Sequence, residues 1–240
     1  MLYSQRLSLV AWLKEWGFPL SLSLCTHGML WEAHPPRQTP EFAYIFLVPV
    51  LAWLYSRPSA LKVFGCIIIT GWIYQIAMVG WMRHVSFGGM CLATLLLSFY
   101  SSIWFLFAHS WINFFRKSTF AGRLLVITGL SALWVSIEWG RTLFTLGFPW
   151  CPLSVTQWER PVLLQGASVL GAWSVSFFLI FFNLSVCSYL HHLFIRRRQG
   201  KGFLNRTICP ELYISLFLLF LMVYPFFINC LLYTSDAADE

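Results

Sequence analysis

Long runs of apolar residues, separated by short polar stretches, make up most of the 240-residue chain. A helix that crosses a membrane needs about 20 mostly apolar residues in succession. Five apolar stretches without a charged residue are clear: 63–81, 89–115, 124–137, 162–190 and 212–234. The third is short, so we expect its helix to extend beyond these bounds. The pattern therefore predicts at least five membrane-spanning helices.

Two weaker candidates precede these five, one between residues 15 and 32 and the other between residues 41 and 57. Each contains a proline, Pro19 or Pro49, which a membrane helix tolerates because neighbouring groups satisfy the freed carbonyl. With both included, the predicted fold is all-α, a polytopic bundle of about seven spans following an N-terminal segment of residues 1–15. The predicted spans lie near residues 16–31, 42–56, 63–81, 89–115, 121–139, 162–190 and 212–233.

The composition excludes most other classes of protein. Hydrophobic residues make up 58% of the chain, charged residues 10%, and the mean hydropathy is +0.69. Soluble domains are nearer half apolar and one quarter charged, so this chain has too few polar residues to cover a soluble enzyme domain. Strands of an outer-membrane barrel alternate apolar and polar residues, which these continuous apolar runs do not. A helical membrane protein remains.

The distribution of the 16 basic residues predicts the orientation of the chain in the membrane. Numbered alternately from the N-terminus, one set of connections holds 12 Lys and Arg residues and the other holds 4. Cytoplasmic connections carry the excess of basic residues. We therefore expect a cytoplasmic N-terminus and a periplasmic C-terminus. Because the charges lie between apolar runs rather than on one folded face, no nucleic-acid partner is expected.

No motif for a metal, a cofactor or a common catalytic site is present. The seven cysteines and six histidines have no metal-ligand or paired spacing, so we expect no zinc site, no disulfide framework and no cofactor. His109 falls within the predicted fourth span. It is interpreted as a packing residue in preference to a proton or ligand site.

The segment after the predicted fifth span is unusual for a connection. Glu138 and Arg141 are three residues apart, so on a continuing helix they share a face and can form an ion pair. Apolar and aromatic residues with Gly and Pro follow, up to Trp150. Two interpretations stay open: an interfacial ion pair that ends the span, or a half-buried loop that lies against lipid or another domain.

These residues resemble a known family. The E-W-G-R of residues 138–141 and the L-G-F-P-W of residues 146–150 look like the segment after the fifth helix of bacterial apolipoprotein N-acyltransferases, and Gln157 matches the glutamine that follows there. Trp81 and the F-G-G-M of residues 87–90 are similar to the loop after that family's third helix. The similarity extends over most of residues 16–232.

The resemblance implies an activity and a location. Members of the family move an acyl chain from a phospholipid to the N-terminal diacylglyceryl-cysteine of a lipoprotein, in the bacterial inner membrane. Eight membrane helices carry an inserted nitrilase-like domain, in which a Glu-Lys-Cys triad forms an acyl thioester before the amine takes the chain. The implied partners are a phospholipid donor, a diacylated apolipoprotein acceptor and the membrane.

The resemblance also implies which residues bind substrate. Phe148 and Trp150 would line the entry for the lipid tails, while Gly147 and Pro149 would shape the turn. Glu138 and Arg141 would hold the loop in place. The implied substrate-binding set is Glu138, Arg141, Gly147, Phe148, Pro149, Trp150 and Gln157.

The chain departs from the family in two ways. The family's Gly-Tyr-Ser before the glutamine is Ser154-Val155-Thr156 here, so the contacts with lipid tails are expected to differ. The nitrilase-like domain and the eighth helix are not within the 240 residues, so no residue is assigned to the triad. Cys151, Cys209 and Cys230 are not candidates for it.

The last residues, 234–240, switch abruptly to a small acidic tail. We expect this tail to be artefactual or unstructured, with the true sequence ending near Tyr233, and we expect the fragment alone to be inactive. The alternative is a non-enzymatic membrane protein, either a lipid-binding partner or a small transporter.

Overall fold

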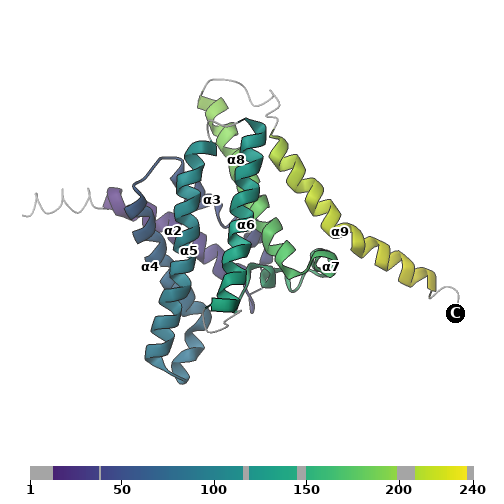
Figure 1. Ribbon diagram of the computed structural model, residues 1–240, viewed down its shortest axis with the longest axis horizontal. Coiled ribbons are helices and arrows are strands. Elements are labelled where there is room, and N and C mark those ends of the chain that lie inside the picture. Colours follow the sequence, from purple (N-terminus) through teal and green to yellow (C-terminus); the bar gives the residue numbers. More distant parts are fainter. Residues whose placement is uncertain (1–12, 38, 116–118, 145–149, 199–208, 237–240) are drawn as a thin grey trace, which may run out of the picture. The chain divides into compact units, whose positions relative to one another are not determined.

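The computed structural model describes residues 13–37, 39–115, 119–144, 150–198 and 209–236, and in these ranges the chain forms helices and no strand (Figure 1). The prediction of an all-α fold is confirmed. The longer helices are α2 (Phe18–Ala33), α4 (Ala60–Val79), α5 (Phe87–Phe115), α6 (Phe120–Phe144), α8 (Ala172–Arg198) and α9 (Pro210–Asp236). The shorter ones are η1 (Leu13–Gly17), η2 (Pro40–Tyr44), α3 (Val48–Leu54), η3 (Gly80–His84), η4 (Leu153–Gln157) and α7 (Pro161–Leu170).

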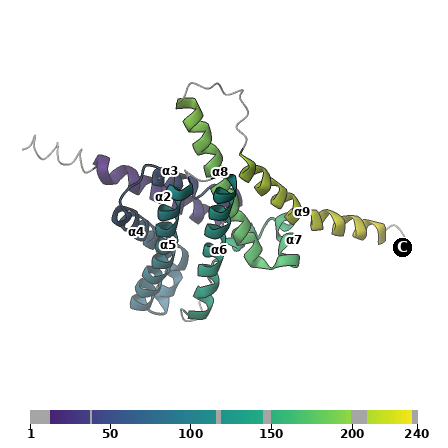
Figure 2. The ribbon, with the colours of Figure 1, turned by 45° about the horizontal axis from the view of Figure 1, so that its top comes forward.

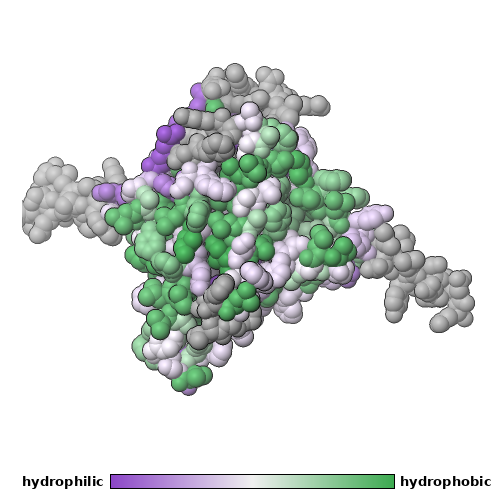
Figure 3. Space-filling view, viewed as in Figure 1, coloured by the Kyte–Doolittle hydropathy of each residue, from purple (hydrophilic) through white to green (hydrophobic). Residues whose placement is uncertain are grey.

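Five helices in the described ranges are long and apolar enough to cross a membrane. They begin at Ala60, Phe87, Phe120, Ala172 and Pro210. Hydrophobic residues cover much of the face drawn in Figure 3. Large apolar side chains on these helices are also exposed, such as Leu125 at 70% and Ile73 at 53%. A soluble monomer rarely exposes so much apolar surface, whereas a membrane helix turns it towards lipid.

Two of the predicted spans are not continuous helices. In the stretch predicted near 42–56, η2 ends at Tyr44 and α3 starts at Val48, with Pro49 in its first turn. The seven residues of α3 extend only about 10 Å, far less than the hydrocarbon thickness of about 30 Å.

The stretch predicted near 162–190 divides into α7 and α8 at Gly171, whose φ of 77° ends the first helix. Glycine adopts this left-handed conformation without steric cost, so the chain breaks here. A run of apolar residues alone does not reveal either break.

The chain divides into two compact units, Met1–Trp31 with Phe46–Lys117 and Glu32–Ile45 with Ser118–Glu240. In the first unit, α4 and α5 lie side by side and antiparallel, joined by η3 (Figures 1 and 2). A Cβ atom on Gly71 of α4 would lie 2.8 Å from Oγ of Ser98 on α5. Because Ser98 Oγ donates a hydrogen bond to the Ile68 carbonyl at 2.8 Å, only glycine fits between the two helices here.

Two histidines in the first unit, the buried His27 and the half-buried His109, hydrogen-bond to the protein. His27 of α2 has its Nδ1 atom 3.0 Å from the Ser23 carbonyl and 3.1 Å from Thr70 Oγ1. His109 of α5 has Nε2 2.8 Å from the Pro58 carbonyl, just before α4 begins. The His27 ring therefore links α2 to α4, and the His109 ring links α5 to the segment before α4, as a packing residue would.

In the second unit, α8 packs against α6, α7, α9 and η4. The contact between α7 and α9 is very close at Gly166, where a Cβ atom would lie 3.0 Å from Met222 Cβ and 3.2 Å from Met222 Cα. The backbones therefore approach within the space that a methyl group would need. This packing holds the short helix α7 against a long membrane helix (Figure 2).

Candidate functional site

Glu138, near the end of α6, is buried, and it does not pair with Arg141. Four ion pairs occur among the described residues, and neither of these two side chains takes part in them. Instead, Glu138 Oε1 accepts a hydrogen bond from the Leu153 amide at 2.7 Å. The ion pair, one of the two interpretations left open, is therefore not formed. The physical reason is the first turn of η4, whose free amides need acceptors that the preceding Pro152 does not supply.

A second helix satisfies the next amide of η4. The Ser154 amide donates to Ser176 Oγ on α8 at 3.0 Å. Within η4 itself, Thr156 Oγ1 donates to the Leu153 carbonyl at 2.7 Å. Side chains from α6 and α8 thus hold the N-terminal turn of η4 in the second unit.

Gln157, at the other end of η4, is completely buried and binds the protein through its whole amide group. Its Nε2 atom donates to the Pro40 carbonyl and to Thr156 Oγ1, both at 3.1 Å. Its Oε1 atom accepts a hydrogen bond from the Tyr44 hydroxyl at 3.3 Å. These contacts use both amide protons and the accepting oxygen, so Gln157 binds η2 and η4 together.

Sequence reasoning missed Asn183 of α8, which also binds η2. Its Nδ2 atom donates to the Ala43 carbonyl at 2.8 Å and to the Leu179 carbonyl of its own helix at 2.8 Å. At the other end of the same short helix, Glu41 and Arg160 form an ion pair. The sequence does carry a signal, since an asparagine among phenylalanines in a predicted span must find a polar partner.

Of the implied substrate-binding residues, Trp150 lies at the surface with 46% of its side chain exposed. Gly147, Phe148 and Pro149 lie outside the described residues. Arg141 has a buried Nε atom, and Glu138 has a buried Oε2 atom, each without a hydrogen-bond partner. The structure therefore describes four members of the implied set: Glu138, Arg141, Trp150 and Gln157.

Cys151 follows Trp150 with a φ of 51°, in the left-handed region, and its thiol is partly buried. Burial raises the pKa of Cys151 to about 11, and the positive charge of Arg141 offsets only part of this shift. The thiol is protonated at neutral pH and is a poor nucleophile. This agrees with leaving Cys151 out of any catalytic triad.

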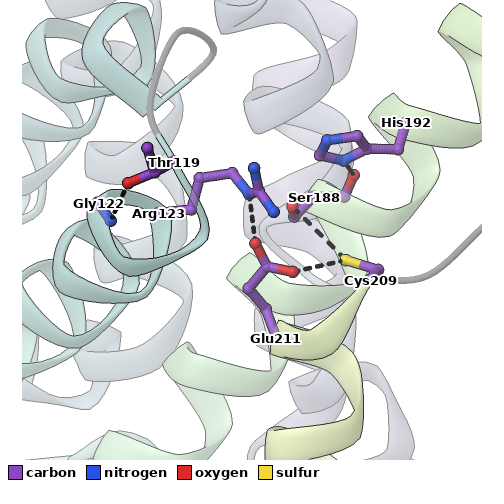
Figure 4. Close-up of polar contacts among 7 residues, drawn as sticks. All are labelled: Thr119, Gly122, Arg123, Ser188, His192, Cys209 and Glu211. Carbon is purple, nitrogen blue, oxygen red and sulfur yellow. Dashed lines mark hydrogen bonds and ion pairs between the residues drawn. The ribbon is translucent and has the colours of Figure 1, made fainter.

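A second polar cluster joins the start of α6 to α8 and α9 (Figure 4). Arg123 forms an ion pair with the buried carboxylate of Glu211. The other oxygen of that carboxylate accepts a hydrogen bond from the Cys209 thiol, with Sγ 3.0 Å from Oε2 and 3.8 Å from Ser188 Oγ. Burial, together with the adjacent carboxylate, raises the pKa of Cys209 to about 11. Cys209 therefore has a glutamate beside it, but the neighbouring cation is an arginine and the thiol stays protonated.

A comparison with known protein families shows to which family the chain belongs. The model of the "Apolipoprotein N-acyltransferase N-terminal domain" matches residues 28–185, well over half of the chain. The chain belongs to the apolipoprotein N-acyltransferase family. The matched region contains η2, η4 and Asn183, so the polar contacts around Gln157 all lie within it, whereas Cys209 and Glu211 lie beyond it.

Two curated relatives match shorter parts of the chain. It is 34% identical over 77 residues to Apolipoprotein N-acyltransferase 1 of Treponema denticola, in a match that covers 32% of this chain and 14% of the relative. It is 38% identical over 52 residues to Apolipoprotein N-acyltransferase of Geobacter metallireducens, in a match that covers 22% of this chain and 10% of the relative. The matches thus span about one tenth to one seventh of these relatives.

Proposed function

We propose that this chain is the membrane domain of an enzyme that moves an acyl chain from a phospholipid to the N-terminal diacylglyceryl-cysteine of lipoproteins. The family match over residues 28–185 carries this proposal. The five apolar helices support a multi-pass protein, which we place in the bacterial inner membrane. The N-terminus is cytoplasmic, as the distribution of basic residues predicts.

The proposed role of this domain is to receive the lipid tails beside the catalytic site. Trp150 offers an exposed indole for contact with the tails. The family resemblance assigns the same role to Phe148, which lies outside the described residues. The family resemblance assigns the shaping of the turn to Gly147 and Pro149, which also lie outside the described residues. The partnerless buried atoms of Glu138 and Arg141 leave one hydrogen-bond acceptor and one donor for polar groups of the substrate.

We infer that the chain by itself does not transfer the acyl group. Covalent transfer through a thioester requires a reactive thiolate, and the family resemblance assigns no residue of this chain to the Glu-Lys-Cys triad. Burial also raises the pKa of Cys151 and of Cys209 to about 11, which disfavours their thiolates. A direct test incubates the purified chain with phospholipid vesicles and a diacylated lipopeptide. We expect no amide-linked third acyl chain by mass spectrometry, and any such product would overturn the claim of inactivity.

The lipid-entry role is tested separately by photolabelling. Vesicles contain a phospholipid with a photoreactive group near the end of one acyl chain, and labelled peptides are identified by mass spectrometry. We expect labelling of the peptide with Trp150 to fall severalfold in a Trp150→Ala variant. Trp139 is the matched control, since its side chain is 52% exposed on α6. Equal labelling around both tryptophans, unaffected by Trp150→Ala, would indicate ordinary lipid contact and favour a non-enzymatic membrane protein.

A further inference from the structure

Two buried amide side chains bind the short helix η2 through its backbone. Gln157 donates to the Pro40 carbonyl and Asn183 donates to the Ala43 carbonyl. The two residues come from η4 and α8, and both side chains are fully buried. We call Gln157 and Asn183 the η2 clamp.

We propose that the η2 clamp consists of positioning residues that hold η2 and η4 as one body and thereby fix the chain that carries Trp150. This role differs from the substrate contact that the family resemblance implies for Gln157. Each polar atom of the Gln157 amide already has a protein partner, in Pro40, Tyr44 or Thr156. The side chain is also fully buried, so a contact with a lipid or a peptide would have to displace these bonds.

The position of Trp150 follows from how η4 is held at its two ends. Glu138 and Ser176 bind the amides of the first turn, and Gln157 binds η2 from the last residue. Cys151 and Trp150 lie directly before this fixed turn, so their backbone starts from a defined point. Releasing one end of η4 would let this segment move away from α6 and α8.

Aromatic packing contributes to the same contact, and the test must separate it from the hydrogen bonds. The Tyr44 ring lies edge-on to Phe182 and Phe178, with ring centroids 5.5 and 6.3 Å apart. These contacts do not involve the amide groups. A Tyr44→Phe variant keeps the ring and removes only the hydroxyl that donates to Gln157 Oε1. Faster modification in this variant would therefore report the lost hydrogen bond and not a loss of aromatic packing.

The native Cys151 is a reporter of this position, because burial now slows its reaction with thiol reagents. The experiment measures the modification rate of the Cys151 peptide by mass spectrometry, using the full chain in vesicles. In Gln157→Glu a carboxylate oxygen faces the Pro40 carbonyl, and in Asn183→Asp one faces the Ala43 carbonyl. We expect each variant to react about tenfold faster than the wild type, since each replaces a buried hydrogen bond by a repulsion. Gln165→Glu on α7 makes the same chemical change outside the clamp and is expected to react as the wild type does.

A pH series separates positioning from general loosening. When the introduced carboxyl of Gln157→Glu is protonated, its O–H can donate to the Pro40 carbonyl again. With a pyridyl disulfide, which also reacts under acidic conditions, the rate ratio of Gln157→Glu to wild type should return towards one as the pH falls. A ratio that stays high at acidic pH would mean that the substitution loosens the unit by other means, and the proposal would be wrong.

Gln157→Met tests the proposal without an added charge, in case the carboxylate variants do not fold. It keeps the length of the side chain and removes its hydrogen bonds, so faster modification of Cys151 is again expected. Wild-type rates in folded Gln157→Met and Asn183→Asp would overturn the proposal. The relevance of the clamp to lipid entry rests on the proposed function, but the Cys151 rate does not. If photolabelling at Trp150 fails while the Cys151 rates change, the proposed function falls and the clamp stands.

Discussion

At the scale of single residues, buried polar side chains in the second unit bind backbone groups of another segment. Glu138, Ser176, Gln157 and Asn183 each hydrogen-bond a main-chain amide or carbonyl at a short helix. A short helix such as η4 has few internal hydrogen bonds, and in an apolar surrounding each unsatisfied group is costly. The polar residues are therefore placed where the helical backbone ends.

Replacing Glu138 by alanine leaves the buried Leu153 amide without an acceptor. We expect the free energy of unfolding to fall by about 1–3 kcal/mol, the cost of an unsatisfied buried donor. Glu138→Gln keeps a side-chain oxygen and should lose clearly less. The measurement is reversible unfolding of the chain in mixed detergent micelles, followed by circular dichroism. Ser136→Ala, at an exposed serine that bonds only the Ala132 carbonyl of its own helix, is the control. Equal losses for the alanine and glutamine variants of Glu138 would contradict the role of Glu138 as an acceptor.

The ion pair between Glu41 and Arg160 gives the structure a small dependence on pH. The hydrogen bond from Arg160 holds the pKa of Glu41 below its ordinary value of 4.5. A carboxyl with a lowered pKa stabilises the folded state above the unfolded-state value, and this contribution disappears as the pH falls through the lowered pKa. The stability difference between wild type and Glu41→Gln should thus be present at neutral pH and vanish in acid.

The same detergent unfolding, repeated from pH 7 to about pH 3, measures this difference. Because both side chains are largely exposed, with 66% and 45% exposure, the effect is small and should weaken further in high salt. Glu159→Gln is the comparison variant, because Glu159 interacts with Arg160 through its charge but forms none of the described ion pairs. A difference that grows on acidification would rule out the stabilising role of the Glu41 carboxylate.

The family resemblance singled out Glu138 and Gln157 as implied substrate-binding residues, but the sequence did not reveal the protein groups that they bind. The Gln157 side chain binds Pro40, 117 residues away, and Asn183 binds Ala43, 140 residues away. No local rule connects such positions. The ion pair of Glu138 with Arg141, one of two interpretations left open, was a local inference from helical spacing. It failed because the fold brings the buried Leu153 amide close to Glu138, and this amide needs the Glu138 carboxylate as its hydrogen-bond acceptor.

At the scale of the helices, composition predicts where apolar helices occur better than where they break. The stretches around α4, α5, α6 and α9 are recognisable because their apolar runs are long and free of internal breaks. Gly171 divides another such run. A single glycine among apolar residues does not by itself predict a break, because glycine is also frequent inside continuous membrane helices. The break becomes visible only from its backbone conformation.

The contact of α7 with α9 depends on Gly166, which has no room for a side chain. An added Cβ atom would lie 3.0 Å from Met222 Cβ and 3.2 Å from its Cα, and the backbone atom cannot give way as a flexible side chain does. Gly166→Ala should therefore lower the free energy of unfolding by about 1–3 kcal/mol, the usual cost of overpacking. Gly140→Ala on α6 is the control, because its Cβ atom would meet nothing within 4 Å. That variant should be neutral or more stable by about 0.4–1 kcal/mol. An unchanged free energy of unfolding in Gly166→Ala would mean that α7 and α9 leave room for a methyl group at this position.

At the scale of the whole molecule, the open question is how often the chain crosses the membrane. Seven crossings are predicted from the sequence, and five described helices are long and apolar enough for one. The difference lies at the N-terminal end, where α2 has 16 residues and α3 has 7. A 16-residue helix extends about 24 Å, so α2 is close to the length that a crossing requires. Helix α3 alone is too short, and it comes nearer to that length only when the preceding η2 is counted with it.

The side of the membrane on which residues 37 and 57 lie decides between these counts. With seven crossings, Arg37 lies on the outer side and Arg57 on the cytoplasmic side, and the 12 to 4 division of basic residues holds. Single cysteines introduced at these positions into a cysteine-free chain, labelled in intact and in lysed cells with an impermeant maleimide, report the side directly. We expect Arg37→Cys to label in intact cells and Arg57→Cys only after lysis. Controls are cysteines at Arg83 and Arg160, which should be outside, and at Lys62, which should be inside.

Labelling of both test positions only after lysis would leave five crossings with the same cytoplasmic N-terminus, since removing two adjacent spans preserves the orientation of all that follow. Labelling of both in intact cells would instead contradict the charge-based orientation, because Arg57 and Lys62 share one connection.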